Sequence, residues 1–212
     1  MHIPDGFLDA KTWISTAVLS GGTLSYGIAK TKQVLNERQV PKMGVMAAFI
    51  FAAQMINFPV AGGTSGHLIG GALAAITLGP WSASLIMATV LIIQCLFFQD
   101  GGLTALGANI FIMGIVAPFV GYSVYKIIVG NSQAKGRVFI GTFLAGWSST
   151  FIASLVCTFL IVISNTVPLK VALPAMAGWH ALIGIGEGII TAIVISYLSK
   201  VRADLVFNST KV

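Results

Sequence analysis

Apolar residues occur along this chain in long blocks separated by Gly, Pro and polar positions. Most of the blocks are long enough to cross a bilayer, which takes about 20 residues of helix because the hydrocarbon core is about 30 Å thick. The pattern predicts an all-α membrane protein with about seven transmembrane helices in one bundle. The blocks are 12–29, 43–59, 67–79, 81–98, 103–129, 138–164 and 176–199.

The block at 67–79 is short and rich in Gly and Ala. We expect a half-length or re-entrant helix buried against its neighbours, because a broken span is tolerated only inside protein. No separable soluble domain and no polar linker is visible. The chain is therefore taken as one transmembrane domain over residues 1–212, with an N-terminal tail at 1–11 and a C-terminal tail at 200–212.

Composition supports a membrane protein and excludes most other classes. The chain is 56% hydrophobic and only 8% charged, whereas soluble domains carry about a quarter charged residues. The net charge of +6 is spread thinly over short loops and forms no basic stripe, so nucleic acid is not an expected partner. Cys95 and Cys157 lie inside apolar blocks without a His or Cys at ligand spacing, and we expect them to pack as small apolar residues.

The distribution of basic residues predicts the orientation. In a seven-span arrangement, ten of the twelve Lys and Arg lie on one side: Lys30, Lys32, Arg38, Lys42, Lys126, Lys135, Arg137, Lys200, Arg202 and Lys211. The other side holds Lys11 and Lys170, together with Asp5, Asp9 and Asp100. Because cytoplasmic loops carry the excess of Lys and Arg, we expect the N-terminus outside the cell and the C-terminal tail in the cytoplasm.

The first block carries small residues at every fourth position, a spacing that lets another helix approach closely in lipid. They are Ala17, Gly21, Ser25 and Ala29. Two interpretations stay open at this point. The ladder contacts another helix of the same bundle, or it is the docking face for a separate subunit.

The N-terminus carries the most informative candidate site. The first ten residues lack the basic region and cleavage site of a signal peptide, and the bulky His2 disfavours removal of Met1, so we expect Met1 to stay. The amine of Met1, the amide nitrogen of His2 and the imidazole Nδ1 of His2 can then chelate one ion through fused five- and six-membered rings. Planar nitrogen sites of this kind favour Ni(II) or Cu(II).

His67 is a candidate for the fourth nitrogen. It begins the third block, directly after the loop VAGGTSG, which returns from the outer side. Pro4 and Gly6 are expected to turn the tail back into the bundle, where Phe7 and Leu8 could pack. The alternative is that His2 stands at its position by chance and that His67 is a helix cap or loop residue.

Three further polar residues lie in apolar blocks and are candidates for supporting this site or gating access to it: Asn57, His180 and Glu187. His180 and Glu187 are seven residues apart, and hence on one helical face. A carboxylate within a span is costly and is usually paired or functional. We expect structural support rather than direct ligation.

Motif absences limit the chemistry. The sequence contains no G-x-x-x-x-G-K-[ST] and no H-E-x-x-H, so neither ATP hydrolysis by this chain nor a zinc protease is expected. Two rivals stay open: an intramembrane hydrolase built on His67, His180 and Glu187, and a channel or scaffold without its own ligand.

Several strings together resemble one known family. They are MHIPDGFL, QMINFPVAGGTSGHLIGGALAAITLGPW, QDGGLTALGANIF and WHALIGIGEGIIT. They look like the nickel/cobalt substrate-binding (S) components of energy-coupling-factor (ECF) transporters, the CbiM/NikM family. The resemblance is weakest between residues 130 and 175.

This resemblance implies a bundle with the N-terminal tail inserted and with Ni(II), alternatively Co(II), held by nitrogens of Met1, His2 and His67. MHIPDGFL is similar to nickel-type members, so Pro4 and Asp5 favour nickel. The implied partners are a transmembrane coupling subunit, two cytoplasmic ATPases and a small accessory membrane protein. The chain would capture metal without being an enzyme, as a multi-pass protein of a prokaryotic plasma membrane.

Overall fold

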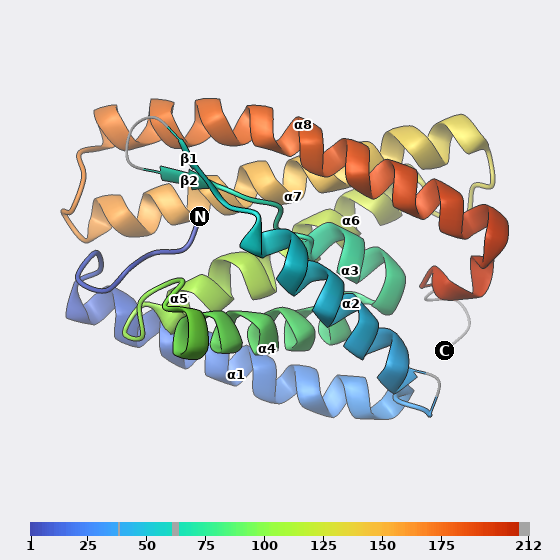
Figure 1. Cartoon of the computed structure of the whole chain (residues 1–212), viewed down its shortest axis with the longest axis horizontal. Helices are drawn as coiled ribbons and strands as arrows, with labels where there is room; N and C mark the ends of the chain where they lie inside the picture. The colour runs from blue at the N-terminus through green and yellow to red at the C-terminus, as the bar shows by residue number, and fades with distance from the viewer. Residues whose placement is uncertain (38, 61–63, 208–212) are drawn as a thin grey trace.

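The computed structural model describes residues 1–37, 39–60 and 64–207. Figure 1 shows a bundle of helices in which α1 and α8 lie along opposite sides. The helices are α1 (Ala10–Val34), α2 (Gln39–Met55), α3 (Gly71–Leu78), α4 (Pro80–Phe98), α5 (Leu106–Asn109), α6 (Ala117–Ile128), α7 (Lys135–Ile163) and α8 (Leu169–Val201). A π-helical segment, η1 (Ile110–Val116), joins α5 to α6, and a short 3-10 turn, η2 (Ala203–Leu205), follows α8.

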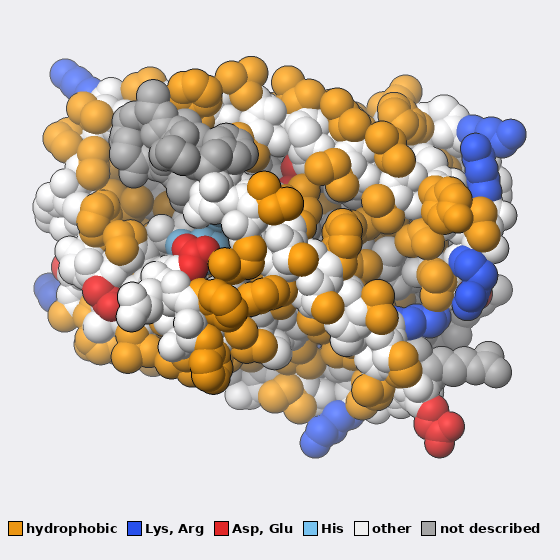
Figure 2. Space-filling view, viewed as in Figure 1, with side chains coloured by type: hydrophobic (Ala, Val, Ile, Leu, Met, Phe, Trp, Pro, Cys, Tyr) orange, Lys and Arg blue, Asp and Glu red, His pale blue; other side chains and the backbone are white. Residues whose placement is uncertain are grey.

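The prediction of a helical membrane protein is confirmed in its coarse form. Four helical stretches of the described chain are long and apolar enough to cross a membrane: Pro80–Phe98, Leu106–Ile128, Lys135–Ile163 and Leu169–Val201. Large apolar side chains such as Phe97, Phe159 and Leu182 are exposed on them, and Figure 2 shows hydrophobic side chains over much of the visible face. Such a surface suits lipid and not water.

The fold is helical as predicted, with one local departure between α2 and α3. The chain leaves α2 at Met55 and forms two short antiparallel strands, β1 (Phe58–Val60) and β2 (Thr64–Gly66), with Phe58 opposite Gly66. His67 therefore does not begin a helix, and α3 starts four residues later at Gly71. The local reason is Gly70, whose φ of +78° is a conformation that glycine adopts without strain.

Helix α3 is the short, buried helix that the Gly- and Ala-rich block predicted. It has eight residues, and all of them are buried. Eight residues of helix rise about 12 Å, so α3 cannot cross a bilayer by itself. It lies inside the bundle, where its neighbours shield the unpaired backbone groups at its ends from lipid.

The two ends of the bundle differ in charge. The end of α8 lies at one end of the bundle, here called the C-terminal end, and Met1 lies within the other end (Figure 1). Blue Lys and Arg side chains gather at the C-terminal end in Figure 2, and red carboxylates lie near the N-terminal tail. Arg38 and Lys211, which the orientation prediction also counted, lie outside the described residues.

The small-residue ladder of α1 divides between two roles. Ala17 packs inside the bundle against Gly107, where an added Cβ would collide with the Ala17 backbone. Gly21, Ser25 and Ala29 are exposed, and nothing lies within 4 Å of a Cβ added at Gly21. An internal contact therefore explains Ala17 alone.

Candidate metal site

The N-terminal tail brings three of the predicted ligand groups together. The amine nitrogen of Met1 lies 2.9 Å from Nε2 of His67, although the two residues are 66 positions apart. The ring of His2 stacks on the ring of His67, with 4.8 Å between the ring centroids. Met1 and His67 are only 5% and 4% exposed. These groups meet inside the bundle, beside the β1–β2 hairpin.

The hydrogen bonds of the two histidines fix which nitrogens carry lone pairs. Nδ1 of His67 lies 2.8 Å from the carbonyl oxygen of Leu68, and a carbonyl can only accept, so Nδ1–H donates and Nε2 carries the lone pair. Nε2 of His2 lies 3.2 Å from Oε1 of Gln94, which leaves Nδ1 of His2 as the basic nitrogen. Both lone pairs belong to atoms that the chelate hypothesis needs.

Nδ1 of His2 is buried next to a carboxylate oxygen and has no hydrogen-bond donor. That oxygen is Oδ1 of Asp100, at a distance of 3.2 Å. Burial, and next the positive charge of the Met1 amine, lowers the pKa of His2 to about 3. The ring is therefore neutral at neutral pH, so two acceptor atoms face each other. Such a pair favours a cation beside it.

Burial also prepares the terminal amine for ligation. It lowers the pKa of the Met1 amine from 8.0 to about 6. At neutral pH the amine is then mostly uncharged, and a metal ligand must be deprotonated.

Hydrogen bonds to the backbone of Ile3 hold the tail in register. Asn109 accepts a bond from Ile3 N at 2.8 Å and donates one to Ile3 O at 3.0 Å. Gly102 N also donates to Ile3 O at 2.9 Å. Ile3 is 1% exposed, so these bonds satisfy polar groups that water does not reach.

Asp5 anchors the tail to the loop after α4. Its carboxylate accepts bonds from Leu103 N at 3.0 Å and from Thr104 N at 2.8 Å, and from the Thr104 hydroxyl. These bonds lower the pKa of Asp5. A Cβ at Gly102 would collide with the backbone of Asp5 and lie 2.6 Å from a Pro4 carbon, so only glycine permits this approach.

Glu187 supports the segment that carries His67. Its two carboxylate oxygens accept bonds from Ile69 N and Gly70 N, each at 2.8 Å. Gln54 donates to Ile69 O at 2.7 Å. The segment has no helix or sheet partners of its own here, so these two side chains fix its path. His180 donates from Nδ1 to Met176 O at 2.8 Å within α8.

Not every predicted site residue is brought to this place. Asn57 follows the end of α2, is exposed, and makes no hydrogen bond to a described residue, so the structure does not connect it to the site. Leu8 packs against the core, but Phe7 is 39% exposed. The buried residues of the tail are Met1 and Ile3.

The sequence interpretation missed three parts of the site: Asp5 as an anchor, the glycine loop at Gly101 and Gly102, and Asp100 beside His2. The strings MHIPDGFL and QDGGLTALGANIF contain all of them, but nothing in either string alone pairs it with the other. Within residues 1–37, 39–60 and 64–207, no group of three or more His, Cys, Asp or Glu side chains could hold a metal. A metal here requires main-chain nitrogen as well.

Comparison with known proteins places this chain in a family. A family model described as "Cobalt uptake substrate-specific transmembrane region" matches residues 2–205. The chain belongs to the CbiM family. A relative from Archaeoglobus fulgidus, named as a putative fused nickel transport protein NikMN, is 46% identical over 208 residues, covering 97% of this chain and 68% of the relative.

Solved structures share the CbiM-family fold. One described as a truncated transition metal transporter has a TM-score of 0.87 and 36% identity, and the match covers 94% of this chain and 99% of that one. Another, described as the S component of a bacterial ECF transporter, has a TM-score of 0.53 and 18% identity over 80% of this chain and 98% of that chain. The second likeness concerns the fold alone.

Proposed function

We propose that this chain is the substrate-capture subunit of an ECF-type importer and that it binds Ni(II), alternatively Co(II), from outside the cell. The observation that carries the proposal is the 2.9 Å approach of the Met1 amine to Nε2 of His67. Four nitrogens complete the donor set: the Met1 amine, the His2 amide, Nδ1 of His2 and Nε2 of His67. Membership of the CbiM family supports the transport role.

The choice of metal follows from the donors. A backbone amide ligates only after it loses its proton, and Ni(II) and Cu(II) in planar fields promote that loss. Cu(II) would bind such a site as well or better on the Irving–Williams order, so selectivity in the cell rests on geometry and metal availability. The nickel-transport name of the Archaeoglobus relative supports nickel, and the cobalt-uptake description of the family model supports cobalt.

The chain captures metal, and partners supply the energy. We propose a transmembrane coupling subunit, two cytoplasmic ATPases and a small accessory membrane protein in a prokaryotic plasma membrane. The exposed part of the α1 ladder, Gly21, Ser25 and Ala29, suits close approach of another membrane helix. The excess of Lys and Arg at the C-terminal end supports a cytoplasmic C-terminus and an N-terminus facing out.

The contacts of Glu187 oppose the hydrolase rival. A metal-dependent hydrolase needs a water on an open coordination position and a free base. Both oxygens of Glu187 instead accept backbone N–H groups, and His180 is committed on one side to Met176 O. Glu187 therefore acts as a positioning residue for the His67 segment.

The test is to replace His2 by glutamine (His2→Gln). The substitution removes the imidazole Nδ1, and with it the six-membered ring of the chelate, while a bulky side chain at position 2 still disfavours removal of Met1. Ni(II) is titrated into the purified chain, and the absorbance of planar Ni(II) and the bound metal are measured. We expect both to be lost, and also in His67→Ala.

The control is Gln133→Ala, at an exposed position in the loop before α7 at the other end of the bundle. It should keep the spectrum and the bound metal. Unchanged nickel binding in the His2→Gln variant would refute the N-terminal chelate.

A further inference from the structure

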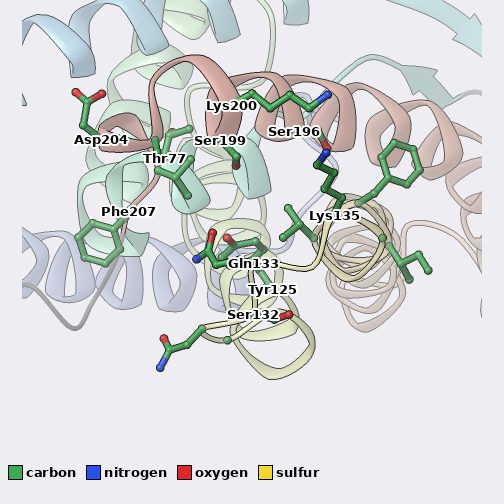
Figure 3. Close-up of a pocket in the computed structure, with 18 of the residues that line it drawn as sticks. Thr77, Tyr125, Ser132, Gln133, Lys135, Ser196, Ser199, Lys200, Asp204 and Phe207 are labelled. Atoms are coloured by element: carbon green, nitrogen blue, oxygen red, sulfur yellow. The ribbon is translucent and has the colours of Figure 1, made fainter.

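A large cavity opens at the end of the bundle opposite the N-terminal tail. Its volume is about 1400 Å³, which exceeds the 300–1,000 Å³ typical of small-molecule sites. It lies between the start of α2, the α6–α7 loop, the start of α7 and the end of α8 (Figure 3). The metal-site residues do not line it.

Cationic side chains dominate the charge of this cavity. Lys42, Lys135 and Lys200 line it, and in Figure 3 Lys135 from α7 and Lys200 from α8 lie on the same side of it. Within the described residues, the side-chain ammonium groups of Lys135 and Lys200 make no ion pair and no hydrogen bond. Like charges that gather in this way attract an anion.

Among the residues that the structure describes, one acidic residue lines the cavity, and it does not balance these lysines. The carboxylate of Asp204 is bound by Arg202, with Nε at 2.8 Å and Nη2 at 2.9 Å. Lys42 donates a hydrogen bond to the backbone carbonyl of Asp204, at 3.4 Å. The cavity therefore keeps a positive excess and also offers the hydroxyls of Ser132 and Ser196 as donors.

The apolar part of the lining identifies the kind of anion. Phe139 and Ile140 line the cavity from α7 and are 45% and 57% exposed on the surface of that spanning helix. An anion with acyl chains could place its head among the lysines and its chains along this ridge. A free phosphate would use only the polar part of the space.

We propose that this cavity binds the phosphate headgroup of an anionic phospholipid from the leaflet at the C-terminal end of the bundle. Lys135 and Lys200 hold the phosphate, the serine hydroxyls donate to the headgroup, and Phe139 and Ile140 contact the acyl chains. Basic pockets between membrane helices bind such headgroups by this chemistry. The inference does not depend on the metal site and goes beyond the capture of metal.

The experiment compares lipids by native mass spectrometry of the purified full chain in detergent. Phosphatidylglycerol and phosphatidylcholine are titrated into wild type and into a Lys135→Ala, Lys200→Ala double variant. Each lysine near an anionic lipid is worth about fivefold in affinity, so the double variant should bind phosphatidylglycerol roughly 25-fold more weakly. Phosphatidylcholine binding should be weak throughout.

The matched control is the Lys11→Ala, Lys170→Ala double variant, which removes two exposed lysines from the opposite end and should keep wild-type binding. The melting temperature checks that each variant folds, and Lys135→Arg with Lys200→Arg should restore binding. Equal binding of both lipids, or an unchanged affinity in the alanine variant, overturns the proposal. If glycerol phosphate competes with the same affinity as phosphatidylglycerol, the cavity binds a soluble phosphate instead. If the alanine double variant loses association with partner subunits but keeps its lipid binding, the cavity binds a protein.

Discussion

Replacing Gly102 by alanine should weaken nickel binding although Gly102 is not a ligand. The added Cβ would collide with the backbone of Asp5 and lie 2.6 Å from both Pro4 C and Asp5 Oδ1. Two of these three atoms, Asp5 N and Pro4 C, belong to the backbone of the tail. No side-chain rotation can relieve such a clash, so the tail itself must move. Because Met1 and His2 belong to that tail, the nitrogens they offer would no longer meet His67.

The magnitude follows from the contacts that are lost. Overpacking costs about 1–3 kcal/mol, and the buried bond from Gly102 N to Ile3 O contributes about 1 kcal/mol. The total of about 2–4 kcal/mol opposes the docked tail, and a tenfold change corresponds to about 1.4 kcal/mol. Nickel affinity should fall roughly 30- to 700-fold.

The assay is competition for Ni(II) between the purified protein and a chromophoric chelator. The control is Gly178→Ala on α8, where nothing lies within 4 Å of the added Cβ, and its affinity should match wild type. A Gly102→Ala protein that melts like wild type and binds nickel within threefold of it would refute the role of the docked tail.

Three other predictions concern the same site. Asn109→Ala leaves Ile3 N buried without its acceptor, which costs about 1–3 kcal/mol. Nickel affinity should therefore fall about 10- to 100-fold, whereas Asn57→Ala should match wild type. Equal losses in the two variants would contradict the role of Asn109 in holding the tail. Glu187→Gln puts an amide group where Ile69 N and Gly70 N both need acceptors. Nickel affinity should therefore fall about tenfold or more, while the planar Ni(II) spectrum is retained at saturating metal. Loss of that spectrum would mean that Glu187 does more than position His67. The pKa of the Met1 amine is lowered to about 6, so the amine is uncharged above that pH and nickel affinity should fall as the pH drops through 6; an affinity that is flat from pH 7 to pH 5 would exclude the amine as a ligand.

Much of the architecture follows from the sequence because lipid imposes a simple rule. A span must bury its backbone in helix and present apolar side chains, so the block at 81–98 corresponds to α4 (Pro80–Phe98) and the block at 138–164 to α7 (Lys135–Ile163). The proposed chelate of Met1 and His2 is an equally local prediction, since two adjacent residues would supply three of its donors.

The sequence pattern failed where helix and extended chain share a composition. Small and apolar residues from 67 to 79 suit either state, and their pattern predicts a single helix. In the structure, α3 starts only at Gly71. Glu187 and Gln54, from α8 and α2, hold the preceding segment outside a helix. A contact between residues 118 positions apart leaves no trace in local hydrophobicity.

The sequence alone determined that this chain is a membrane protein, and it predicts that the first two residues chelate a metal, because apolar length and covalent connectivity are local properties. Only the tertiary structure decided which distant groups complete the site. In the structure the Met1 amine contacts His67, Asp5 contacts Thr104 and Asn109 contacts Ile3. Asn57 is exposed and makes none of these contacts. Such pairings depend on how helices and loops pack, and packing is a property of the whole chain.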